Sequence, residues 1–291
     1  MNEAIIKSPV LGEQYTQIKH PSGLTVLLCP MSGFSSAYAL FAAKVGSIDT
    51  TFKTPGEDDF VEVPPGIAHF LEHKMFENEE GDAFQKYAAT GASANAYTSF
   101  DRTAYLFSCS DNFPQAMEIL LDFVSRPYFT PESVQKEQGI IGQEIQMYDD
   151  SPSWQTMVGL LESLYHNNPV RLDIAGTVES ISEITADLLY RCYHTFYNLS
   201  NMVLAVAGSF DPQVVLDLCD KILKPQEEVE IQWRRADEPR EVAAHRKAKA
   251  LSVSVPMFQI GFKGEAGDTL QNLKAQVMDE ILLEILCGES S

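Results

Sequence analysis

Residues 66–77 read GIAHFLEHKMFE and place two histidines and a glutamate inside a run that is otherwise apolar. The apolar positions are spaced as on a buried helix, and they are Ile67, Phe70, Leu71, Met75 and Phe76. In a helix, His69 and His73 stand one turn apart on the same face, with Cβ atoms about 5–6 Å apart. Both imidazoles can therefore direct one ring nitrogen toward a single metal ion.

Zinc suits this pair, because it binds neutral imidazole at about 2.0–2.1 Å and its catalytic sites use three protein ligands plus water. Glu72 follows His69 by three residues and so lies beside the ion, where a general base can take a proton from the zinc-bound water. HxxEH reverses the commoner HExxH order and is termed an inverted zincin. The alternative is two hydrogen-bonded helix histidines beside an unrelated glutamate, although unpaired polar groups are costly in an apolar helix.

A third ligand is expected from a helix predicted at 131–149, which contains VQKEQGIIGQEIQMY. Glu137 and Glu144 are seven residues apart, or two turns, and so share one face of that helix. A single glutamate is most often exposed to solvent. This face, however, is surrounded by Ile140, Ile141 and Ile145. Glu144 is therefore expected to be half-buried, which makes it the best candidate for the third ligand.

Composition narrows the class of protein. The 291 residues are 45% apolar, enough for one large or two smaller domains. A net charge of −20 disfavours nucleic-acid binding and would attract basic peptides, although a solvated acidic surface explains it equally well. No apolar run reaches about 18 residues, so no membrane span is expected. The N-terminus does not resemble a secretory signal, which predicts a cytoplasmic location.

Strand and helix patterns alternate along the first 225 residues. Strands are predicted at 23–31, 36–48, 94–100, 103–109 and 202–208, with a polar loop at about 49–65. Helices are predicted over the opening motif and at 82–89, 113–125, 131–149, 153–166, 184–197 and 211–223. Strands in hairpin-like pairs indicate a mixed, mainly antiparallel sheet with helices on one face, an α+β architecture.

These residues resemble the pitrilysin family, which includes the insulin-degrading enzyme and the mitochondrial processing peptidases. The resemblance rests on HFLEH at 69–73, followed about seventy residues later by a glutamate on a helix. Three further stretches agree with it, namely GASANAYTSFDRTAY (91–105), DIAGTVESISEIT (173–185) and FYNLSNMVLAVAG (196–208). It covers about residues 20–225 and is nearest to the bacterial processing-peptidase-like branch.

The resemblance implies a zinc endopeptidase in which Glu72 activates a zinc-bound water. The zinc ligands would be His69, His73 and Glu144. Glu137 would support catalysis by fixing the orientation of a ligand. The substrate would be a peptide or small protein, held in extended form against Asn95 and Ala96 as an added strand of the sheet.

The resemblance also implies a protein of two homologous halves. Residues 1–225 would form an N-terminal metallopeptidase domain, 226–255 a charged linker, and 256–291 the truncated beginning of a second, homologous domain. An opening strand is expected at 253–264 and a helix at 270–287. The chain could pair as a homodimer or as a heterodimer with a paralogous chain.

Two rival functions stay open. One is a non-catalytic subunit of a paired peptidase complex that binds peptide or a partner. The other is a metal-dependent hydrolase of a non-peptide substrate. The complete set of His69, Glu72, His73 and Glu144 favours the peptidase, since non-catalytic members usually lose a ligand position.

Overall fold

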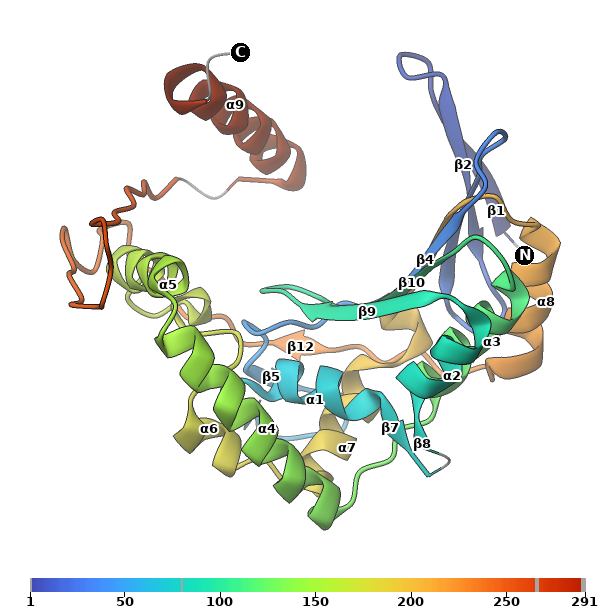
Figure 1. Cartoon of the computed structure of the whole chain (residues 1–291), viewed down its shortest axis with the longest axis horizontal. Coiled ribbons are helices and arrows are strands. Elements are labelled where there is room, and N and C mark those ends of the chain that lie inside the picture. The colour runs from blue at the N-terminus through green and yellow to red at the C-terminus, as the bar shows by residue number, and fades with distance from the viewer. Residues whose placement is uncertain (1, 80, 265–266, 289–291) are drawn as a thin grey trace.

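A seven-stranded sheet forms the centre of the protein, in a computed structural model that describes residues 2–79, 81–264 and 267–288. Its strand order is β1-β2-β3-β11-β4-β10-β9 (Figure 1). Neighbouring strands are antiparallel except β3 and β11, which are parallel. The strands are β1 (Asn2–Ser8), β2 (Glu13–Lys19), β3 (Thr25–Pro30), β4 (Ala37–Ala43), β9 (Ser93–Thr98), β10 (Thr103–Cys109) and β11 (Met202–Gly208). The predicted mixed, mainly antiparallel sheet is confirmed.

Helices cover one face of this sheet, as the alternation of buried residues requires. In β4, Phe41 is fully buried among the helices, whereas Tyr38 on the other face is 42% exposed. The helices are α1 (Ile67–Met75), α2 (Ala83–Thr90), α3 (Phe113–Ser125), α4 (Pro131–Asp149), α5 (Pro152–Leu164), α6 (Val178–Ser182), α7 (Ala186–Phe196) and α8 (Pro212–Ile222). Short 3-10 turns occur at Pro169–Arg171 and Leu199–Asn201. The predicted α+β layering is confirmed.

The sequence patterns missed some short strands. The expected polar loop at 49–65 contains β5 (Thr51–Lys53) and β6 (Val61–Glu62), which join β12 (Gln232–Trp233) in a small sheet. Phe52 anchors this sheet in the core, and Trp233 stacks on Phe196 with ring centroids 5.3 Å apart. The β1–β2 hairpin was also not predicted, nor was the pair β7 (Glu77–Asn78) and β8 (Gly81–Asp82). The linker is thus tied to the first domain through β12.

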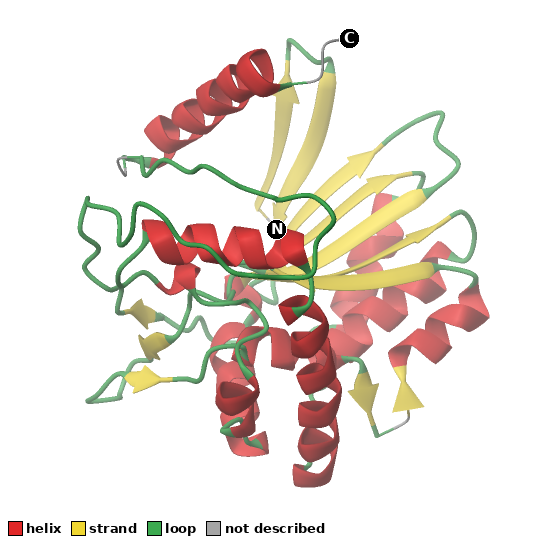
Figure 2. Cartoon of the chain, turned by 60° about the vertical axis from the view of Figure 1, so that its left-hand side comes forward, coloured by secondary structure: helices red, strands yellow, loops and turns green. Residues whose placement is uncertain are grey.

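The strand expected at 253–264 is wrong, because those residues have no regular structure. They run past α5 instead, with Gly261 against Leu160 and Leu164, and Lys263 Nζ donates to a Glu238 oxygen at 2.5 Å. The helix expected at 270–287 is present as α9 (Thr269–Cys287), which projects away from the sheet (Figures 1 and 2).

The division into domains at residues 225 and 255 stays a prediction, and residues 265–266 and 289–291 of the expected second domain lie outside the described residues. None of the helices in the described ranges is long and apolar enough to cross a bilayer.

Candidate metal centre

The start of helix α1 is fixed by the segment 173–185, whose role the sequence alone left open. Gly66 precedes the helix with φ of 92°, and a Cβ atom there would lie 2.5 Å from the Ala175 oxygen. Gly176 meets Pro65 in the same way, with φ of 76°. Ser180 Oγ also donates a hydrogen bond to the Pro65 oxygen at 2.8 Å. These close contacts at the two glycines set where α1 begins, and they thereby set where His69 and His73 lie.

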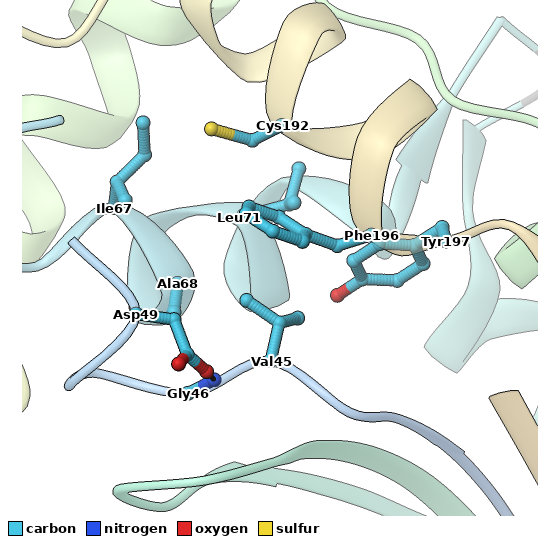
Figure 3. Close-up of a pocket in the computed structure, with 9 residues that line it drawn as sticks. All are labelled: Val45, Gly46, Asp49, Ile67, Ala68, Leu71, Cys192, Phe196 and Tyr197. Carbon is cyan, nitrogen blue, oxygen red and sulfur yellow. Dashed lines mark hydrogen bonds between the residues drawn. The ribbon is translucent and has the colours of Figure 1, made fainter. Parts of the chain in front are cut away.

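The side of α1 opposite the histidines packs against α7 and the chain after β4. Figure 3 shows Ile67, Ala68 and Leu71 of α1 facing Phe196 across a small, largely apolar pocket. The one carboxylate lining it, Asp49, accepts a hydrogen bond from the Gly46 N–H at 2.8 Å and pairs with the linker's Arg235 at 2.6 Å. The packing of α1 against α7 and the chain after β4 holds the helix in place and turns its polar face toward α4.

On that polar face, His69 and His73 of α1 meet Glu144 of α4. The potential ligand atoms of the three side chains all lie within 4.8 Å of one another, the one such group found among the described residues. Nε2 of His69 is 3.7 Å from Glu144 Oε1, and Nε2 of His73 is 3.4 Å from Oε2. Ligands around a tetrahedral zinc ion stand about 3.3–3.6 Å apart. The three residues therefore fit a zinc ion.

The surroundings of the two histidines set the tautomer of His73 and the charge of His69. Nδ1 of His73 is 3.0 Å from Glu137 Oε1, so the proton sits on Nδ1 and Nε2 is left for a ligand bond. Burial, with the charge of His73, lowers the pKa of His69 to about 4 and keeps that ring neutral at pH 7. Burial also lowers the pKa of His73, but Glu137 and the nearby carboxylates outweigh it and leave the pKa raised.

Glu72 lies on the same face of α1 and is tied to the edge strand of the sheet. Thr98 Oγ1 of β9 donates a hydrogen bond to Glu72 Oε2 at 2.6 Å. Burial raises the pKa of the Glu72 carboxyl, and the Thr98 hydrogen bond and His73 offset only part of that rise. A carboxylate with a raised pKa is a better proton acceptor near neutral pH. Thr98 was not among the predicted residues, although alternation along the strand places it on the same face as Ala96.

Glu144 is half-buried, as predicted, but its neighbours differ in part from the expected ones. Ile141 and Ile145 are buried, whereas Ile140 is 45% exposed. Tyr148, four residues after Glu144, donates its hydroxyl hydrogen bond to Glu144 Oε1 at 2.6 Å. Tyr148 was not among the predicted residues, although its i+4 spacing from Glu144 places the two side chains on one helix face.

Asn95 and Ala96 lie on β9, the last strand of the sheet, which contacts α1 on one side and, among the described residues, pairs only with β10. Asn95 is exposed and Ala96 half-buried. The Asn95 side-chain oxygen accepts a hydrogen bond from the Ala96 N–H at 2.9 Å. The edge strand is thus open for pairing, and one of its N–H groups is capped by a neighbouring side chain.

The sequence matches two family models. Residues 62–178 match the insulinase domain of peptidase family M16, and residues 183–289 match the domain described as the peptidase M16 inactive domain. The first match contains the histidines, Glu72, Glu137, Glu144 and β9. The second begins before α7 and continues beyond the linker.

Several known sequences and solved structures are similar to this chain. The uncharacterized zinc protease YmfH of Bacillus subtilis is 47% identical over 287 residues, which are 97% of this chain and 67% of that protein. Cytochrome b-c1 complex subunit 1 of mouse is 31% identical over 163 residues, covering 54% of this chain and 34% of that one. The crystal structure of an M16-like peptidase from Alicyclobacillus acidocaldarius superposes with a TM-score of 0.77 and 43% identity, over 82% of this chain and 56% of that chain.

Proposed function

Since this chain belongs to the M16 (insulinase) peptidase family, we propose that it is the metal-binding part of a zinc-dependent endopeptidase. The observation that carries the proposal is the convergence of His69, His73 and Glu144, with Glu72 on the same helix face. The chain spans about two thirds of its B. subtilis relative, so the activity proposed is that of the longer assembly.

The residues divide the chemistry among them. His69, His73 and Glu144 would hold the zinc, which when bound supplies a Lewis acid that polarises the scissile carbonyl and acidifies water. Glu72 is the general base, because it stands beside the ligands and its pKa is raised by burial. Glu137 holds the His73 ring in the tautomer that leaves Nε2 for the metal.

The substrate is a peptide in extended conformation that adds to the free edge of β9. Main-chain hydrogen bonds would supply affinity with little dependence on sequence. The Asn95 side chain now occupies the Ala96 N–H, so it must turn aside as the peptide pairs with the strand. Thr98, two residues after Ala96 on β9, links this strand to the general base, because its hydroxyl donates a hydrogen bond to Glu72.

A second homologous unit completes the site, either on a longer form of this chain or on a partner chain. Helix α9 supports this, since none of its described residues is buried and many of them are exposed leucines and isoleucines. The likeness to cytochrome b-c1 complex subunit 1 keeps a non-catalytic, partner-binding subunit as the second candidate. A cytoplasmic location stays a prediction from the sequence.

The proposal is tested by the zinc content of this chain, measured together with peptide hydrolysis by the longer assembly that contains it. Wild type should bind about one zinc per chain. Glu72→Gln should keep its zinc but lose about 10²–10⁴-fold in hydrolysis, the contribution typical of a general base. Glu144→Gln should lose the zinc as well, whereas Glu132→Gln at the exposed start of α4 should change neither. A wild type that takes up no zinc after reconstitution at neutral pH would favour the non-catalytic subunit.

A further inference from the structure

Glu144 is held by a series of contacts from residues that are not proposed metal ligands. These residues have no part in the chemistry described above. Tyr148 donates its hydroxyl hydrogen bond to Glu144 Oε1 at 2.6 Å. Its ring stacks on Trp154 at the start of α5, with centroids 4.6 Å apart and planes inclined by 19°. Trp154 Nε1 in turn donates to Asp173 Oδ2 at 2.5 Å. We call Tyr148, Trp154 and Asp173 the supporting row.

The supporting row ends on the loop that also fixes helix α1. Asp173 Oδ1 accepts the Ala175 N–H at 3.0 Å, and the Asp173 carbonyl oxygen accepts the Gly176 N–H, also at 3.0 Å. Ala175 and Gly176 are the residues that press against Pro65 and Gly66 before α1. The histidines and Glu144 come from separate helices, yet both sets are positioned from this one loop.

We propose that Tyr148, Trp154 and Asp173 are positioning residues that fix the carboxylate of Glu144 for metal binding. A hydroxyl hydrogen bond to a carboxylate is among the stronger kinds and restricts rotation of the group. The stacked rings are rigid and hold the hydroxyl in place from α5. The inference rests on the proposed function, because it takes Glu144 to be a zinc ligand.

Packing between α4 and α5 is the alternative role for these residues, and it predicts something different. Packing needs the aromatic rings, whereas positioning needs the hydroxyl of Tyr148 and the N–H of Trp154. Tyr148→Phe removes a single oxygen and keeps the ring stacked on Trp154. The variant therefore separates the two roles without opening a cavity in the fold.

The zinc dissociation constant of the whole chain, measured by competition with a chromophoric chelator at neutral pH, tests the proposal. Tyr148→Phe should bind zinc about 10–100-fold more weakly, the cost typical of losing a partner that orients a ligand. The visible absorption bands of the cobalt-substituted protein should also change, since they report ligand geometry. The melting temperature of the metal-free protein should stay close to wild type.

Matched variants complete the test. Tyr165→Phe removes a hydroxyl from the end of α5, where the ring lies under Lys263, and should leave zinc affinity unchanged. Trp154→Phe keeps an aromatic ring but removes the donor to Asp173, so its affinity should fall between those of wild type and Tyr148→Phe. Wild-type affinity and an unchanged cobalt spectrum in Tyr148→Phe would overturn this inference alone. A wild type without zinc would overturn the proposed function with it.

Discussion

The protein buries histidines in two regions and treats them differently. His20, in the turn before β3, uses both ring nitrogens: Nδ1 is 2.8 Å from Ser22 Oγ and Nε2 is 3.1 Å from Asp220 Oδ1. His69 is nearly as buried, 8% exposed against 3%, but its Nδ1 has no hydrogen-bond partner within the described ranges. Its Nε2 stops 3.7 Å from Glu144, beyond hydrogen-bond reach.

A buried polar group without a partner costs free energy, so the two regions serve different purposes. The His20 cluster contains a serine, a histidine and a carboxylate, but Ser22 is 1% exposed and cannot reach a substrate. Its completed hydrogen bonds tie the turn to helix α8. The His69 cluster is less well satisfied in itself and leaves ring nitrogens aimed at a common point. We infer that the incomplete cluster is the functional one.

Removing one histidine from each region should give the sharpest contrast in metal content. His69→Gln takes away one of three ligands and should weaken zinc binding by more than the roughly 10–100-fold that supporting residues cost. His20→Gln lies outside the cluster and should keep about one zinc per chain. Elemental analysis after dialysis against a low concentration of free zinc measures both. Equal zinc content in the two variants would remove the distinction between the regions.

The free energy of unfolding should depend more on His20 than on His69, the reverse of the order expected for zinc content. In the metal-free protein, His20→Ala leaves the Ser22 hydroxyl buried without its partner, so the free energy of unfolding should fall by about 1–3 kcal/mol. Urea unfolding followed by circular dichroism measures the change. Ser22→Ala, which removes the partner rather than the ring, should cost less. If His20→Ala were neutral, the cluster would not be the structural tie described here.

The sequence predicted the elements whose cause is local. Apolar spacing predicted α1, and short apolar runs predicted β4, β10 and β11. It could not predict the sheet of β5, β6 and β12, because Phe52 and Trp233 meet only through the tertiary fold. Residues 253–264 have a strand-like pattern but pair with no strand in the described part of the chain, and Phe258 and Phe262 are 81% and 90% exposed.

The residues of the candidate site were likewise predictable only where local spacing brings them together. Helical spacing placed His69, Glu72 and His73 on one face, and the shared face of α4 brought in Glu137 and Glu144. Tyr148 could have been found from its i+4 position. Trp154 and Asp173 could not, because their link to Glu144 depends on how α5 and the loop at 173–176 fold back onto α4.

Replacing His69 by an apolar residue should stabilise the metal-free protein. His69→Leu removes a buried Nδ1 that has no partner in the described structure and fills similar space, so the free energy of unfolding should rise by about 1 kcal/mol. Urea unfolding in the presence of a chelator measures it. The same exchange at His20 should destabilise, and a loss of stability in His69→Leu would mean that its ring is structurally satisfied after all.

The gain from His69→Leu should also depend on pH. Burial and the charge of His73 lower the pKa of His69 to about 4 in the folded protein, whereas an unfolded histidine titrates near 6.5. Between these values the unfolded chain binds a proton that the folded chain does not. Stability from the neutral ring is therefore complete above about pH 6.5 and is lost as the pH falls toward 4.

Leucine takes up no proton, so the stability difference between His69→Leu and wild type should widen as the pH falls from about 7.5 to about 5. His73 and Glu72 titrate in both chains, and to first order their contributions cancel in the difference. Unfolding both metal-free proteins in urea at three pH values across this range measures the trend. A difference that stays constant or narrows would show that the pKa of His69 is not lowered in the folded protein.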